Sequence, residues 1–178
     1  MDFEGDLAMA EMIDIYDENR KKTGEVADRK TKLKKGNYML YVVALLQNAE
    51  GKFLVTKRTM DKKWAAGAWE IPGGGVALGE TSETAVIREV LEETGIDISN
   101  ANNRVIYSYR NDDEGGDNYF MDMYLCTLDF SLANVVMQES EVMDVLLVTE
   151  KEIDELKAKD GFLHYERIKQ ALKAGICK

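Results

Sequence analysis

GGVALGETSETAVIREVLEETGI, residues 74–96, joins a glycine-rich loop directly to a segment dense in glutamate. The loop follows Pro72, the only proline in the chain. The residues at fixed offsets follow the pattern G-x5-E-x7-R-E-(apolar)-x-E-E-x-G-(apolar), and they are Gly74, Glu80, Arg88, Glu89, Glu92, Glu93, Gly95 and Ile96. A backbone that a ligand can approach closely therefore stands next to a group of carboxylates.

The glutamate-rich half of this segment predicts a helix over residues 81–94. At about 100° per residue, Glu89, Glu92 and Glu93 are spaced so that they share one helix face. Thr81 suits the start of the helix, where its hydroxyl can cap a backbone amide, and Gly95 suits the left-handed turn that ends one. We expect the opposite arc to pack into the core through Val86, Ile87, Val90 and Leu91.

Three carboxylates on one helix face repel one another, and a bound cation would offset that repulsion. Hard oxygen ligands at this density suit Mg²⁺ or Mn²⁺, so Glu89, Glu92 and Glu93 are the candidate metal ligands. Gly73, Gly74 and Gly75 let backbone approach a substrate and are candidate binding residues. An acidic helix face alone is more often a solvated surface, but the accompanying loop at fixed spacing favours metal-assisted hydrolysis of a phosphoanhydride.

The complete pattern resembles the signature box of the Nudix hydrolase family, whose members cleave a nucleoside diphosphate linked to another group. The resemblance covers about residues 38 to 158. It implies an α/β (α+β) fold, an α/β/α sandwich with a mixed β-sheet. It also implies a Mg²⁺-dependent diphosphohydrolase acting on a small nucleoside diphosphate derivative. In the family, the arginine matching Arg88 holds the glutamate matching Glu80 and braces the loop against the helix.

Hydrolysis needs a base within hydrogen-bond reach of the attacking water. Glu89 could serve while contacting the metal. Other family branches take the base from a later loop, where Glu141 is the first candidate here and Glu139 the second; the alternative is that both are exposed loop acids. Arg58 follows a strand at a position where family members often hold substrate phosphates, although a structural ion pair is the better explanation of an arginine there. His164, the only histidine, is expected at a surface or helix start.

The composition of the chain limits the kinds of partner that it can bind. The 178 residues carry a formal net charge of −10, which argues against nucleic-acid and anionic-membrane binding. Cys126 lies in a strand-like run and is expected in the core, while Cys177 stands near the last residue. Residues 1–11 show no signal peptide, and no apolar run is long enough to span a bilayer, so we expect a cytoplasmic protein. Homodimers are frequent in the family, and nothing in the sequence decides for or against one.

Alternation of apolar residues and turn signals predict the remaining elements. We expect strands at 12–16, 38–46, 53–58, 69–71, 104–109, 119–128 and 142–148, and further helices at 150–159 and 165–174. A polar turn at 17–24 and a basic, solvated connector at 29–35 separate the first two strands. The chain then divides into a tail with a short strand or hairpin extension at 1–37 and a hydrolase domain at 38–178, together one globular unit with helices on both faces of a mixed sheet.

Two other functions stay open. The segment 13–19, followed by Gly24, is similar to a Nudix branch related to isopentenyl diphosphate isomerases, which use a cysteine and a glutamate in set motifs; neither cysteine here sits in such a motif. A non-catalytic nucleotide sensor on the same scaffold is the second alternative, although such proteins tend to lose box carboxylates. The substrate itself stays open among oxidised nucleotides, ADP-ribose, nucleotide sugars, dinucleoside polyphosphates and capped RNA ends, of which the acidic charge disfavours RNA.

Overall fold

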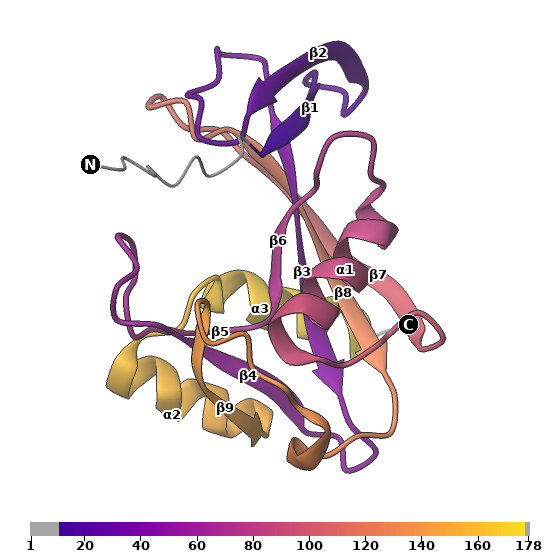
Figure 1. Cartoon of the computed structure of the whole chain (residues 1–178), viewed down its shortest axis with the longest axis vertical. Helices are drawn as coiled ribbons and strands as arrows, with labels where there is room; N and C mark the ends of the chain where they lie inside the picture. The colour runs from indigo at the N-terminus through magenta and orange to yellow at the C-terminus, as the bar shows by residue number, and fades with distance from the viewer. Residues whose placement is uncertain (1–10, 177–178) are drawn as a thin grey trace, which may run out of the picture.

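The computed structural model describes residues 11–176 and shows a mixed sheet with helices on both sides (Figure 1). Strands β1 (Met12–Tyr16) and β2 (Lys22–Asp28) form a hairpin of their own. A seven-stranded sheet contains β3 (Met39–Gln47), β4 (Phe53–Arg58), β5 (Trp69–Glu70), β6 (Gly73–Gly75), β7 (Asn102–Asn111), β8 (Tyr119–Thr127) and β9 (Val142–Val148). The helices are α1 (Ser82–Thr94), α2 (Glu150–Asp160) and α3 (Tyr165–Ile176), with a 3₁₀ turn at Leu132–Asn134. The predicted mixed α+β class is confirmed.

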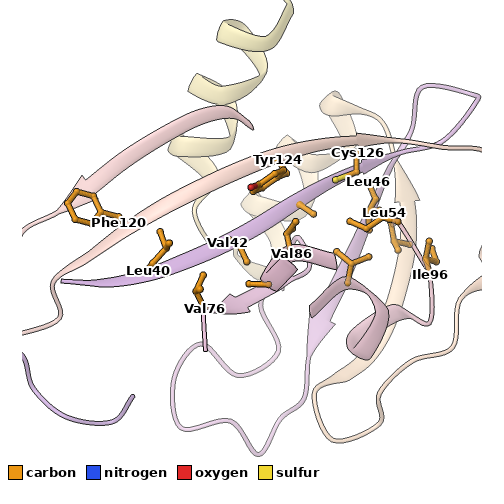
Figure 2. Packing of buried hydrophobic residues seen from close by; sticks show 14 of the residues in the cluster. Leu40, Val42, Leu46, Leu54, Val76, Val86, Ile96, Phe120, Tyr124 and Cys126 are labelled. Carbon is orange, nitrogen blue, oxygen red and sulfur yellow. The ribbon is translucent and has the colours of Figure 1, made fainter. Parts of the chain in front are cut away.

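Alternation along β3 supplies the two larger hydrophobic cores, because successive side chains of a strand point to opposite faces. Leu40, Val42 and Leu46 face the core beneath α1, where Figure 2 shows them beside Val86 of the helix. Val43 and Leu45 face the other core, which α2 and α3 cover through Ile153, Ile168 and Leu172. The layers are therefore helix, sheet and helix, as predicted.

The sheet is interrupted on one side of β3. This strand pairs in parallel with β8 along its whole length, but β4 pairs with it only through Leu46–Leu54 and Gln47–Phe53. Further along the same edge β6 takes over, where Tyr41 to Val43 pair with Gly75 to Gly73. The predicted glycine loop is thus partly a strand. β4 in turn pairs with β5 and β9, so two groups of strands diverge from one edge of β3.

Helix α1 begins and ends where the sequence predicts. The Thr81 hydroxyl accepts a hydrogen bond from the Thr84 amide, and Gly95 adopts φ 72° as it ends the helix. Val86 and Val90 are fully buried. The prediction for Leu91 is wrong, since its side chain is 46% exposed. The buried arc is centred one position earlier and includes Ala85 and Glu89.

The N-terminal hairpin contains a second strand to which the sequence analysis gave no bounds. Residues 22–24 were expected in the polar turn and no element was assigned to 25–28, but residues 22–28 form β2, which pairs antiparallel with β1. Most of β2 is exposed, so no alternation of apolar residues marks it in the sequence. The expected tail at 1–10 and Cys177 lie outside the described residues, whereas Cys126 is in the core as predicted. Within residues 11–176, no helix is both long and apolar enough to cross a bilayer.

Candidate active site

A cleft of about 640 Å³ opens where β4 and β6 diverge from β3. One wall is the β3 segment that carries Tyr41, and the floor includes Gly73 and Gly74 of β6. Arg58 and Glu70, from β4 and β5, line another wall. The fold therefore brings the ends of several strands together around one hollow.

Two glycines of β6 lie where an added side chain would meet close neighbours. A Cβ atom on Gly73 would lie 2.2 Å from the carbonyl oxygen of Val42, and one on Gly74 would lie 2.4 Å from Oε1 of Glu89. The Val42 oxygen is backbone, so Gly73 is needed for the close approach of β3, whereas a side chain at position 74 would push the Glu89 carboxylate out of its place. The predicted glycine segment thus lies at the cleft, with Gly75 beside it.

The three box glutamates of α1 are not equivalent. Glu89 is buried at 8% exposure and lies against Gly74, and the Glu93 carboxylate accepts a hydrogen bond of 3.3 Å from the Gly73 amide. Glu92 turns outward, with 51% of its side chain exposed, and its carboxylate is 3.3 Å from Nη1 of Arg88. Glu89 and Glu93 therefore face the glycine strand, while Glu92 is turned toward solvent and Arg88.

Arg88 connects the helix to the loop that precedes it. Its Nε and Nη2 donate hydrogen bonds of 2.7 and 2.8 Å to the two carboxylate oxygens of Glu80, and Nη2 also donates to the Gly75 carbonyl at 3.0 Å. Glu80 accepts a further bond from the Ala77 amide at 2.9 Å. This is the contact that the family resemblance implies. The Arg88 guanidinium also donates a 2.8 Å hydrogen bond from Nη1 to the carboxylate of Glu89.

Negative charge accumulates beside the cleft. Removal from water raises the pKa of Glu93 well above its usual range, and the neighbouring charges of Glu70 and Glu89 raise it further. Burial also raises the pKa of Glu89 and of Glu70, despite the nearby arginines. Two charges of like sign held together out of water favour a cation between them.

These carboxylates fit a hard divalent cation by donor type and by charge. In the arrangement described for residues 11–176, no three His, Cys, Asp or Glu side chains converge closely enough to hold an ion. Glu89 and Glu93 stand side by side on successive turns of α1, whereas Glu92 is drawn to Arg88. Binding a cation through all three would require the Glu92 side chain to turn away from Arg88 and toward Glu89 and Glu93.

The other predicted site residues lie at different distances from the cleft. Arg58 lines it, and Nη1 is 3.2 Å from both carboxylate oxygens of Glu70. Glu141 is bound to Nζ of Lys62 at 2.5 Å, and its carbonyl accepts from the Thr59 amide, so it stands beside the loop that follows β4. Glu139 is an exposed loop residue.

Three residues of the cleft were missed or misplaced by the sequence analysis. Glu70 carried a signal, because strand alternation puts it on the face opposite Trp69 and Ile71, both buried. His164 precedes α3 as expected, but it also lines the cleft and is within 3.3 Å of the Tyr109 hydroxyl. Arg29 was expected in a solvated connector and instead lines the cleft; nothing in its local sequence indicates this.

Comparison with known proteins gives consistent matches. The family model for the NUDIX domain matches residues 37–171. The uncharacterized Nudix hydrolase lmo0368 of Listeria monocytogenes is 36% identical over 153 residues, which cover 85% of this chain and 88% of that protein. The crystal structure of DR0079 from Deinococcus radiodurans has a TM-score of 0.73 at 21% identity, covering 90% of this chain and 99% of that one. The NUDIX domain of Shewanella oneidensis NrtR, solved with ADP ribose, has a TM-score of 0.60 at 22% identity, covering 76% of this chain and 87% of that chain.

Proposed function

The chain belongs to the Nudix hydrolase family, and we propose that it hydrolyses the diphosphate linkage of a nucleoside diphosphate derivative with the help of Mg²⁺ or Mn²⁺. One observation carries this proposal within the family. Glu89 and Glu93 are held against Gly74 and Gly73, so that two carboxylates and an unobstructed backbone meet beside one cleft.

The metal would be held by Glu89, Glu92 and Glu93. When bound, a divalent cation neutralises phosphate charge and lowers the pKa of a coordinated water. The protein's part is to keep the carboxylates in place. The Arg88 bridge does this by fixing the loop at Glu80 and the side chain of Glu89 together, so the helix face and the glycine strand hold one geometry.

The remaining roles follow from position. Arg58 would donate to substrate phosphate oxygens, because its guanidinium lines the cleft and its buried Nε lacks a hydrogen-bond partner among the described residues. Glu141 is the first candidate for the base that accepts the proton of the attacking water, and its carboxylate is tied to the loop after β4 through Lys62. Glu89 and Glu139 are the other candidates, and Glu139 is the weakest of the three because it is exposed on its loop.

The aromatic part of the cleft supports a nucleoside as the attached group. Tyr41 and Tyr119 meet edge to face at 5.4 Å between ring centroids, and both line the cleft with Phe162. Aromatic walls of this kind stack well on a nucleobase. The NUDIX domain of NrtR was solved with ADP ribose, a ligand of this chemical class.

The isomerase alternative needs a reactive cysteine, and the described part of the chain does not offer one at the cleft. Cys126 is fully buried beneath α1, and burial raises the pKa of its thiol to about 12. It can neither reach a substrate in the cleft nor form a thiolate readily. Cys126 is therefore a core residue, and hydrolysis is the better-supported reaction.

A hydrolysis screen tests the proposal. The purified protein with Mg²⁺ should release phosphate or a nucleoside monophosphate from at least one of the oxidised nucleotides, nucleotide sugars, ADP-ribose and dinucleoside polyphosphates. Glu93→Gln should then lower kcat by about a hundredfold or more, as expected for loss of a charged group that supports transition-state stabilisation. Glu83→Gln, an exposed glutamate of the same helix, is the matched control. Full activity in Glu93→Gln would overturn the assignment of the carboxylates.

A further inference from the structure

Arg29 enters the cleft from outside the segment that the NUDIX family model matches, which begins at residue 37. It directly follows β2 of the N-terminal hairpin. The neighbouring Lys30 is exposed, whereas the Arg29 side chain is half-buried and turned inward. A guanidinium placed in a cleft needs a reason, because its desolvation has a cost unless an anion meets it.

The contacts of Arg29 with the described residues orient its guanidinium and leave some of its N–H donors free for a ligand. The guanidinium carbon lies 5.6 Å from the centroid of the Tyr41 ring, a cation–π geometry, and a Cβ built on Gly75 would be 3.2 Å from its Nε. Its carboxylate partner among the described residues is Glu11, whose oxygens lie 2.9 and 3.1 Å from Nη1. Glu11 is itself 46% exposed, so an incoming anion can replace it at little cost.

The hairpin that carries Arg29 is fixed to the rest of the fold. Tyr16 and Tyr38 exchange backbone hydrogen bonds of 2.8 and 2.9 Å, and the Leu78 amide donates to the Met12 carbonyl at 2.9 Å. The Gly79 amide also donates to the carboxylate of Asp14 at 2.9 Å. Both Leu78 and Gly79 belong to the loop that Arg88 braces. The hairpin is therefore hydrogen-bonded to the loop that Arg88 braces beside the cleft. These bonds hold the Arg29 guanidinium in place before a ligand arrives.

We propose that Arg29 binds phosphate oxygens of the substrate's diphosphate from a different wall of the cleft than Arg58, with Glu11 as the group that the phosphate displaces. This inference rests on the proposed hydrolase function. A planar guanidinium beside Gly75 can donate two parallel hydrogen bonds to a phosphate. The hairpin thereby becomes part of the substrate-binding site, and the segment before residue 37 contributes to function as well as to folding.

Binding of methylenediphosphonate, a diphosphate mimic whose P–C–P bridge is not hydrolysed, tests Arg29 without relying on turnover. Calorimetric titrations in constant excess Mg²⁺ would compare the wild type with Arg29→Ala, Arg29→Lys and Glu11→Gln. Lys30→Ala is the matched control, since it removes one positive charge from the same turn at an exposed position. Circular dichroism and thermal unfolding would show that each variant is folded.

We expect Arg29→Ala to weaken binding by about ten- to a hundredfold, the range for losing hydrogen bonds to a charged group. The affinity of Arg29→Lys should lie between those of the wild type and Arg29→Ala, because lysine keeps the positive charge but cannot donate two parallel hydrogen bonds. Glu11→Gln should tighten binding by a few-fold, on the order of the value of an exposed ion pair. Lys30→Ala should match the wild type. With the hydrolysed substrate, the Arg29 variants should raise KM more than they lower kcat.

The outcomes separate the two proposals. A wild type that hydrolyses its substrate and binds the mimic, with Arg29→Ala and Arg29→Lys binding equally well, would overturn the role of Arg29 and leave the hydrolase function intact. Weakened binding in Glu11→Gln would also count against Arg29, because it would show that Glu11 supports the site and does not compete for it. A wild type that neither binds the mimic nor hydrolyses any substrate would overturn both.

Discussion

Two arginine–carboxylate contacts fasten the segments around the cleft, and they are built in different ways. Arg88 reaches Glu80 over eight residues of sequence, and both side chains are partly in water, at 29% and 21% exposure. Arg20 reaches Asp122 over 102 residues, and the carboxylate there is only 3% exposed. The first shapes the loop beside the helix carboxylates, and the second ties the N-terminal hairpin to β8. Because the Asp122 carboxylate is the more buried, we expect the distant contact to contribute more to stability, and we propose that the local contact contributes more to function.

Removing the Asp122 carboxylate should have the largest effect. It accepts hydrogen bonds from Arg20 and, at 2.6 Å each, from the hydroxyls of Ser82 and Ser108. Asp122→Ala leaves these donors without their acceptor, and we expect a loss of about 3 kcal/mol in the free energy of unfolding. Urea denaturation would measure it, with Asp129→Ala at an exposed position as the control. Equal, small losses in both variants would show that the distant contact does not stabilise the fold.

Breaking the local contact should affect catalysis more than folding. Arg88→Gln removes the bonds to Glu80 and Glu89, which lets the loop and the helix carboxylates move apart. We expect kcat/KM for the substrate found in the screen to fall by about ten- to a hundredfold, with less than about 1 kcal/mol lost in the free energy of unfolding because the pair is partly exposed. Hydrogen exchange should also show a less protected Ala77 amide, whose acceptor is Glu80.

Lys151→Gln is the matched control for Arg88→Gln, since Lys151 is 86% exposed in a surface pair on α2. It should retain wild-type kinetics and stability. If Arg88→Gln instead unfolds as readily as Asp122→Ala and keeps its kcat/KM, the two contacts have exchanged roles and the comparison fails.

Sequence distance explains which features could be predicted. The ends of α1 follow from local chemistry at Thr81 and Gly95, and the two faces of β3 follow from its alternation, so both were predicted. The contact between Glu80 and Arg88 came from a family pattern of fixed spacing. Asp122 gave no signal, because its partners come from the hairpin, from α1 and from β7, which only the folded chain brings together.

The errors have the same origin. Leu91 is apolar and suitably spaced, but it is exposed because the helix turns Glu89 inward toward Gly74. β2 is a strand by virtue of its pairing with β1, not by its composition. Arg29 reads as one basic residue among several until the hairpin places it in the cleft. The roles assigned to the site residues remain predictions that the experiments above address.

Removing the arginine of the distant contact should cost less than removing its carboxylate. In Arg20→Ala, Asp122 keeps the two serine donors, and the lost guanidinium was 35% exposed. We expect about 1.5 kcal/mol lower stability, the lower end for a hydrogen bond to a charged group. Amides of the β1–β2 hairpin should exchange faster while those of β3 stay protected. Uniformly faster exchange would mean that Arg20 supports the whole fold and not the hairpin in particular.

The smallest effect concerns pH, because protonation weakens the Asp122 contacts and leaves the side chain in place. Burial raises the pKa of Asp122, but hydrogen bonds from Arg20, Ser108 and Ser82 outweigh it and hold the pKa below the usual range. The folded state therefore binds this proton less readily than the unfolded state, in which the pKa of an aspartate is about 3.9. The contribution to stability is complete above that pH and is lost as the pH falls toward the folded pKa.

The difference in unfolding free energy between the wild type and Asp122→Asn should thus be constant near neutrality and shrink below about pH 4. Urea titrations at successive pH values would follow it, with Asp129→Asn as the control for general acid effects. If the difference instead grew on acidification, the folded state would bind the Asp122 proton more tightly than the unfolded state does. The fold would then stabilise the protonated carboxyl and not the charged carboxylate.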